Sequence, residues 1–152
     1  MDGAVNSGVS VPAEVAGGRR FSLRRANRAL VLVRRIVTDV VGDYSRVLEL
    51  QEILELEQQY GSRELLRTLQ ADVARAVGRT RRCLEELAAV GVELRDFGRG
   101  LVDFPARVAG REIFFCWQLD EERIMFWHDR HEGVSGRRPI SELADLAARR
   151  WS

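Results

Sequence analysis

The chain has no lysine, only two cysteines and no long hydrophobic run. The scarcity of cysteine and of hydrophobic runs limits the classes of protein to which the chain can belong. No stretch approaches the roughly 18 apolar residues of a membrane-spanning helix, so we expect no transmembrane segment. The amino terminus lacks the basic start and apolar core of a signal peptide, and this predicts a cytoplasmic protein. Cys83 and Cys116 are too few for a disulfide framework and are predicted to be buried free thiols.

The chain also lacks an excess of charge of either sign. The 24 basic residues, all arginine, are balanced by 23 acidic residues, and the net charge of +1 gives no global reason to expect a nucleic-acid partner or an anionic membrane surface. Arginines do gather over residues 19–28, which fits either a solvated helix start or an anion-binding arm. The length of 152 residues fits one domain with a sizeable core.

Two long stretches carry a helical pattern and almost no aromatic residues. Ser22 is a good cap for a helix running to about residue 59, and Gly61 and Ser62 end it and cap a second helix that closes at Gly91. Apolar residues recur in both at alternating spacings of 3 and 4, which predicts an antiparallel helical hairpin. These seam residues are Ala26, Leu30, Val33, Val37, Val40, Tyr44, Val47 and, after the polar Gln51, Leu54, followed in the second helix by Leu66, Leu69, Val73, Ala76, Thr80, Cys83, Leu87 and Val90.

The remaining sequence predicts strands. Residues 101–104 form a short strand that Pro105 stops, residues 112–119 form a central strand that is apolar on both faces, and residues 124–128 form a third. Residues 108–110 and 120–122 supply the turns of a three-stranded antiparallel β-meander. A loop over residues 133–139 precedes a short last helix that Ser141 caps and that runs to Arg149.

The predicted fold class is therefore α+β, with a long antiparallel helical hairpin followed by the meander and a short C-terminal helix. We expect a disordered tail over residues 1–20 and a single domain over residues 21–152. Within that domain, residues 21–91 form the hairpin, residues 92–130 the meander, and residues 131–152 a loop and the short helix.

Six short motifs lie in a fixed order after the hairpin pattern. They are Gly91-Val-Glu-Leu94, Gly100-Leu-Val-Asp-Phe-Pro105, Gly110-Arg-Glu112, Cys116-Trp117, Trp127-His128 and Gly136-Arg-Arg-Pro-Ile140. With the hairpin, they resemble a prokaryotic family of unknown function over residues 21–140. The resemblance implies the fold and no established activity. It also implies an acidic residue at the position of His131, so a site that relied on a carboxylate there is altered in this chain.

Polar residues within this aromatic region are the candidates for a site. Asp103 lies inside a strand, where a carboxylate must be exposed, hydrogen-bonded or paired with an arginine such as Arg107, Arg111 or Arg137. His128 and His131 are possible ligands of a divalent metal, although their spacing matches no established metal motif. His128 also fits a hydrogen-bonded residue at a strand end or a proton carrier.

The other candidates are Arg137, Trp117 and Trp127. Arg137 lies in a glycine-rich loop, where it fits either an anion site or a staple that bonds backbone carbonyls. Trp117 and Trp127 fit either a ligand platform or the hydrophobic core.

No convergent catalytic set is visible, so the sequence favours a non-enzymatic interaction or scaffold module. The alternative is a metal- or anion-binding protein, or an enzyme, centred on Asp103, His128, His131 and Arg137. A homodimer through the hairpin is expected, with a protein partner as a further possibility, because many apolar side chains of the first helix lie outside the seam. These are Ile36, Val41, Leu48, Leu50, Ile53 and Leu56.

Overall fold

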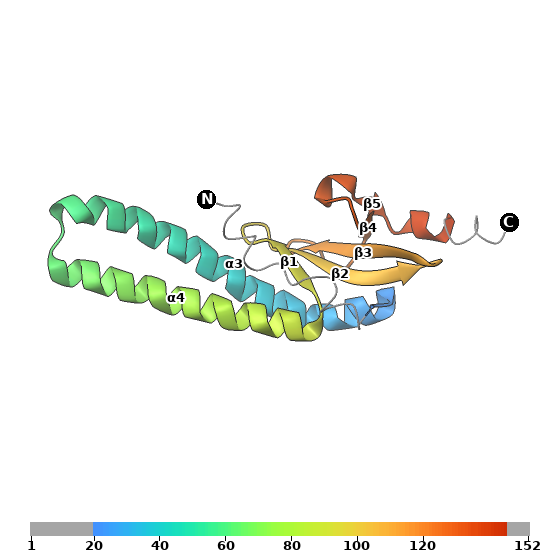
Figure 1. Cartoon of the computed structure of the whole chain (residues 1–152), viewed down its shortest axis with the longest axis horizontal. Coiled ribbons are helices and arrows are strands. Elements are labelled where there is room, and N and C mark those ends of the chain that lie inside the picture. Colours follow the sequence, from blue (N-terminus) through green and yellow to red (C-terminus); the bar gives the residue numbers. More distant parts are fainter. Residues whose placement is uncertain (1–19, 146–152) are drawn as a thin grey trace.

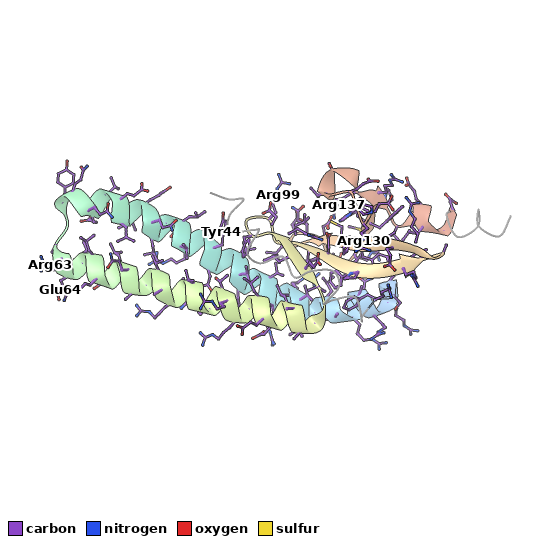
Figure 2. The ribbon with its side chains drawn as sticks, viewed as in Figure 1. Tyr44, Arg63, Glu64, Arg99, Arg130 and Arg137 are labelled. Atoms are coloured by element: carbon purple, nitrogen blue, oxygen red, sulfur yellow. The ribbon has the colours of Figure 1, made fainter. Side chains whose placement is uncertain are left out.

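The computed structural model of the protein describes residues 20–145. The predicted tail over residues 1–20 lies outside this range except for Arg20, as does the predicted end of the last helix at Arg149. The described chain is α+β, as predicted, and Figure 1 shows two long helices side by side with a sheet against one end of them. The helices extend well beyond the sheet to a turn that directly precedes Arg63 and Glu64, whereas Tyr44 lies near the sheet (Figure 2).

The hairpin is formed by helix α3 (Leu23–Tyr60) and helix α4 (Arg63–Val90). Both serine caps are confirmed, since the hydroxyls of Ser22 and Ser62 each accept a backbone N–H at 3.1 Å. Gly91 ends α4 at φ 97°, a conformation that glycine adopts at little cost. Figure 1 places the hairpin turn at the end furthest from the sheet.

The predicted seam is correct near the sheet and incomplete beyond it. Ala26, Leu30, Val33, Val37 and Val40 are all buried. Two residues expected outside the seam are buried as well: Ile36 is 3% exposed in the core cluster, and Leu50 is 1% exposed. The apolar surface left on α3 is therefore smaller than the pattern indicates.

The sheet has five antiparallel strands in sequence order, so the predicted count of three is wrong. The three expected strands are β2 (Leu101–Val108), β3 (Arg111–Gln118) and β4 (Phe126–Asp129). The two missed strands are β1 (Glu93–Asp96) and β5 (Arg138–Pro139), one at each edge. Strand β1 has one apolar residue among four and β5 has only two residues, so neither shows an alternating pattern.

Strand β2 continues through Pro105, where the sequence predicted a stop. The register explains this, because β1 pairs only with residues 101–103 of β2 and leaves one side of Pro105 without a neighbouring strand. The carbonyl of Pro105 accepts the backbone N–H of Phe21 at 2.7 Å, which joins this free edge to the start of α3. The predicted turn at Ala109 and Gly110 is confirmed, and both residues have positive φ, as in a type I′ turn.

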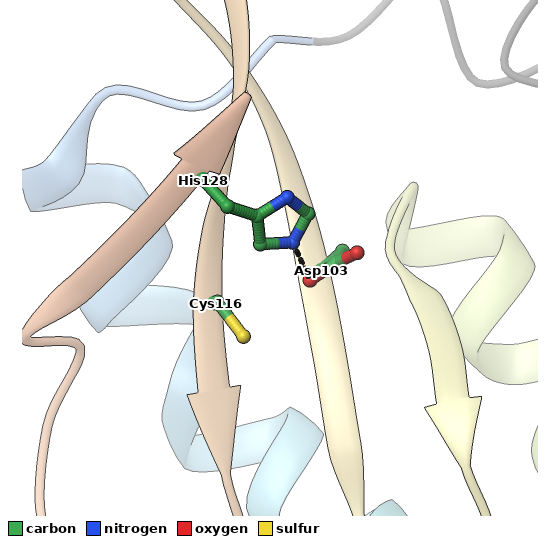
Figure 3. Close-up of side chains that lie close together, drawn as sticks. All are labelled: Asp103, Cys116 and His128. Carbon is green, nitrogen blue, oxygen red and sulfur yellow. Dashed lines mark hydrogen bonds and ion pairs between the residues drawn. The ribbon is translucent and has the colours of Figure 1, made fainter. Parts of the chain in front are cut away.

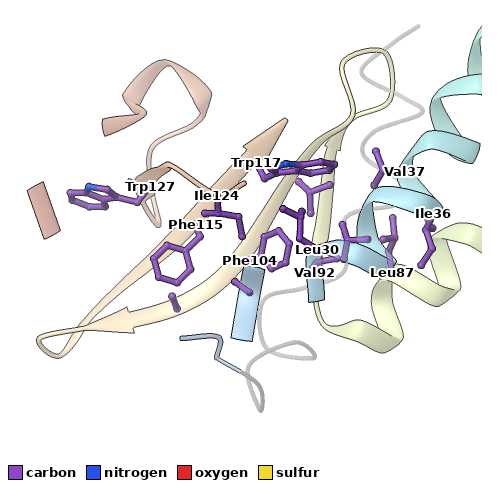
Figure 4. Packing of buried hydrophobic residues seen from close by; sticks show 14 of the residues in the cluster. Leu30, Ile36, Val37, Leu87, Val92, Phe104, Phe115, Trp117, Ile124 and Trp127 are labelled. Carbon is purple, nitrogen blue, oxygen red and sulfur yellow. The ribbon is translucent and has the colours of Figure 1, made fainter. Parts of the chain in front are cut away.

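One face of the sheet packs on the helices. Paired residues Val102 and Trp117, and Phe104 and Phe115, are buried there against Leu30 and its neighbours (Figure 4). The short last helix begins at residue 141, is described to residue 145, and contributes the buried Leu143. Among residues 20–145, no helix is both long and apolar enough to cross a membrane.

Candidate functional site

The opposite face of the sheet, away from the helices, buries three chemically active side chains. Asp103, Cys116 and His128 come from β2, β3 and β4 and point toward one another (Figure 3). Asp103 pairs with Cys116 in the register, and His128 pairs with Phe114, two residues from Cys116 on the same face. Strand alternation thus directs all three away from the tryptophans of the core.

These three residues are almost inaccessible to solvent. Asp103 and His128 are each 2% exposed and Cys116 is fully buried. The imidazole Nε2 of His128 lies 2.9 Å from Oδ1 of Asp103, and its Nδ1 lies 2.8 Å from the backbone carbonyl oxygen of Asp129. Both ring nitrogens therefore face oxygen atoms that can accept a hydrogen bond, and the doubly protonated imidazolium donates to both.

The electrostatics agree with a charged histidine. Burial alone would lower the pKa of His128, and it is the largest single influence. The hydrogen bond to Asp103, the neighbouring Cys116 side chain, the charge of Asp103 and the carbonyl of Asp129 outweigh burial and raise this pKa to about 10. In the absence of a ligand, Asp103 and His128 form a buried ion pair.

Arg95 closes the cluster on the side of β1. Its Nε donates to Oδ2 of Asp103 at 2.9 Å, and its Nη2 forms an ion pair with Oε2 of the buried Glu93. Burial raises the pKa of Glu93 above its ordinary range despite the opposing charge of Arg95. The guanidinium also lies over the ring of Phe114 at 5.3 Å, so it covers the cluster while remaining 38% exposed itself.

Arg137 closes the cluster on the side of β4 and the following loop. Its Nη2 donates to both carboxylate oxygens of Glu121, at 2.6 and 2.9 Å, and to the backbone carbonyl of Cys116 at 3.2 Å. Its guanidinium lies 4.2 Å from the ring centroid of Phe126. Arg137 therefore fastens the loop to the sheet, as one of the two sequence interpretations expected.

The donor atoms of the cluster meet the basic requirement of a metal centre. One carboxylate oxygen of Asp103, Sγ of Cys116 and a ring nitrogen of His128 all lie within 4.8 Å of one another. Oxygen, sulfur and nitrogen donors of these types bind zinc at about 2.0 to 2.3 Å. An ion held by all three residues would take the place of the hydrogen bond between Nε2 of His128 and Oδ1 of Asp103.

The structure brings together only part of the predicted set. Asp103 and His128 are in direct contact, whereas His131 lies exposed on the loop beyond β4 and outside the cluster. Trp117 and Trp127 lie in the helix-facing core, and their indole N–H groups donate to the carbonyls of Glu121 and Pro139. Neither tryptophan reaches the face that carries Asp103.

Cys116 is the residue that sequence reasoning missed, since it was interpreted only as a buried thiol. The signal was present in the predicted turn at residues 108–110. A two-residue hairpin that pairs Val108 with Arg111 also places Asp103 opposite Cys116. Glu93 and Arg95 left no such signal, because β1 itself was not recognised.

Comparison with known proteins places the chain in a family without assigning an activity. A family model described as "Uncharacterized conserved protein (DUF2203)" matches residues 19–140. The chain belongs to this family, and the resemblance found over residues 21–140 is confirmed as membership in a family of unknown function. No curated protein and no solved structure matches the chain.

Proposed function

We propose that this member of the DUF2203 family binds a divalent transition-metal ion, of the zinc type, at Asp103, Cys116 and His128. The observation that carries the proposal is the convergence of three different donor types from three adjacent strands within 4.8 Å. Thiolate and imidazole together favour zinc and its neighbours in the periodic table over magnesium or calcium, which prefer oxygen donors.

Charge balance supports an exchange of protons for the ion. Without metal, the carboxylates of Glu93 and Asp103 balance Arg95 and the protonated His128. Binding of a divalent ion releases one proton from Nε2 of His128 and one from the thiol of Cys116. The buried cluster is therefore neutral in both states, so neither carries an uncompensated charge.

The surroundings of the donors also suit a metal. With its Nε2 proton lost, His128 still donates Nδ1–H to the carbonyl of Asp129, the kind of outer bond that orients metal-bound histidines. Arg95 holds the second carboxylate oxygen of Asp103 and leaves the first for the ion. Two of the three donors are thus oriented before the ion arrives.

Three protein donors leave one position of a tetrahedral zinc ion for water or another ligand. The cluster thus corresponds in donor count to sites at which zinc activates a bound molecule, whereas structural zinc sites use four protein donors. Since free cysteines are typical of proteins in reducing compartments, we also propose that the protein is cytoplasmic.

The test begins with protein purified without chelators. We expect close to one equivalent of a transition metal per chain by elemental analysis, or uptake of one equivalent of added Zn²⁺ by chelator-treated protein. Added Co²⁺ should give the absorption bands of a cobalt–thiolate bond. The variants Cys116→Ser and His128→Gln should lose these bands and most of the affinity.

Matched controls are available in the same chain. His131→Ala removes the exposed histidine and Cys83→Ser removes the other thiol, and neither change should alter stoichiometry or spectrum. Failure of the chelator-treated wild type to take up Zn²⁺ or Co²⁺ contradicts the proposal. So does uptake that Cys116→Ser leaves intact in a variant with an unchanged circular dichroism spectrum.

The alternative function is an interaction module presented by the hairpin. It depends on a different part of the molecule, the exposed face of helix α3.

A further inference from the structure

Helix α3 carries a second, exposed stripe outside the seam that packs on α4 and the sheet. Two of its members, Thr38 and Gly42, also line the rim of a surface hollow shared with α4. The stripe starts at Val31, ends at Leu56 and proceeds throughout in alternating steps of 4 and 3 residues. All of its members are exposed, Val31 by 75% and Leu56 by 69%. Alternating steps of this kind keep one face of a helix in line with a partner helix.

The centre of the stripe is made mostly of small residues. Thr38, Gly42 and Ser45 are three of the four middle positions, the fourth being Glu49, and a Cβ added to Gly42 would meet no atom within 4 Å. Side chains this small allow another helix to approach closely. Apolar residues occupy the two ends of the stripe, at Val31 and Leu56. Tyr60, which is 86% exposed, continues the same face beyond Leu56.

The charges of α3 are divided between its two halves. Residues 23–38 hold five arginines and no acidic residue, whereas residues 39–60 hold six acidic residues and one arginine. A second copy of the helix lying antiparallel places each basic half over an acidic half. A parallel arrangement would bring like charges together.

We infer that this face of α3 joins two copies of the chain as an antiparallel, twofold-symmetric dimer. The stripe of one copy matches the stripe of the other when the two residue numbers of each facing pair add up to 87. Val31 then meets Leu56 of the second copy, Arg35 meets Glu52, and Gly42 meets Ser45. A twofold axis repeats each contact, as an isologous interface requires.

This register of the two α3 helices fits the geometry of the rest of the molecule. Val31 and Leu56 lie about 38 Å apart along the helix at 1.5 Å per residue, so the contact uses most of the length of α3. Arg35 and Glu52 form no ion pair or side-chain hydrogen bond among residues 20–145. Both are therefore available to a partner, and changing them leaves the internal packing of the hairpin intact.

Sedimentation equilibrium at 1–100 µM chain provides the test, and we expect a species of twice 17.3 kDa. Arg35→Glu and Glu52→Arg should each raise the dissociation constant of the dimer about tenfold, because like charges then meet at two symmetric positions. The double variant Arg35→Glu/Glu52→Arg should recover an affinity within about threefold of the wild type. Arg81→Glu, an exposed change of the same charge on α4, should have no effect.

A covalent test examines the register directly. Mild oxidation of Gly42→Cys/Ser45→Cys should give a disulfide-linked dimer, because these positions face each other across the axis within bonding range. Arg81→Cys should not cross-link under the same conditions. A wild type that sediments at 17.3 kDa over the whole range overturns the inference. A dimer whose affinity is unchanged by the single charge reversals, or not restored by the double one, overturns it equally.

Discussion

Replacing Asp103 by asparagine is the sharpest perturbation of the buried cluster. The change keeps the shape of the side chain, removes its charge and replaces one acceptor oxygen by an NH₂ donor. In the wild type, Oδ1 of Asp103 accepts from His128 and Oδ2 accepts from Arg95, both at 2.9 Å. An amide offers one oxygen, so its NH₂ group must face one of the two donors.

The expected cost is large because His128 is only 2% exposed. Removing one partner of a buried ion pair typically costs about 3–5 kcal/mol. His128 can reduce this cost by releasing its proton and accepting from the amide, and the exposed part of Arg95 can be hydrated. We therefore expect Asp103→Asn to lower the free energy of unfolding by about 2–4 kcal/mol.

Urea unfolding of the metal-free protein at pH 7, with chelator present, measures this difference. The matched control is Asp72→Asn, which removes the charge from an exposed pair with Arg75 on α4. Exposed pairs contribute little, so the control should change stability by less than about 0.5 kcal/mol. If Asp103→Asn costs no more than Asp72→Asn, the buried ion pair does not stabilise the fold and our account of the cluster is wrong.

Three further predictions concern the fold and its titration. Because the folded pKa of His128, about 10, exceeds its ordinary value of 6.5, its stabilisation is complete below pH 6.5 and is lost as the pH rises through 10. The metal-free wild type should lose up to about 5 kcal/mol relative to His128→Gln between these pH values in urea titrations. Gly100→Ala should cost about 2–4 kcal/mol in thermal unfolding, since φ is +68° and the new Cβ would lie 2.8 Å from Val37, whereas Gly78→Ala, with no atom within 4 Å, should stabilise α4 by about 0.5–1 kcal/mol. Ser62→Ala, which removes the cap of α4, should lower the melting temperature by an amount equivalent to about 1 kcal/mol, and no decrease would show that the cap is dispensable.

The candidate site could be predicted only in part. Asp103 and His128 stand out because polar residues interrupt aromatic strands, and the structure brings them into contact. Cys116 was not recognised as a site residue, because a buried thiol in a strand is ordinarily inert. His131 attracted attention because it is close to His128 in sequence, yet the chain leaves β4 at Asp129 and carries His131 away from the cluster.

The sequence by itself determined the elements whose signals are local. Apolar periodicity, two serine caps and two glycines define the helical hairpin, a run that is apolar on both faces predicts β3, and a short apolar segment before Pro105 predicts the first half of β2. Such signals need only a few neighbouring residues, so they survive without knowledge of the rest of the chain.

The tertiary structure alone decided which of these residues meet. The edge strands β1 and β5 exist because β2 and β4 offer free backbone groups to pair with, and their own sequences hold too few residues to predict them. Leu50 is buried because α4 covers it, and Arg95 reaches Asp103 because β1 pairs with β2. Contacts of this kind depend on sheet register and helix packing, which join segments far apart in sequence. The cluster of Asp103, Cys116 and His128 therefore forms only in the folded chain.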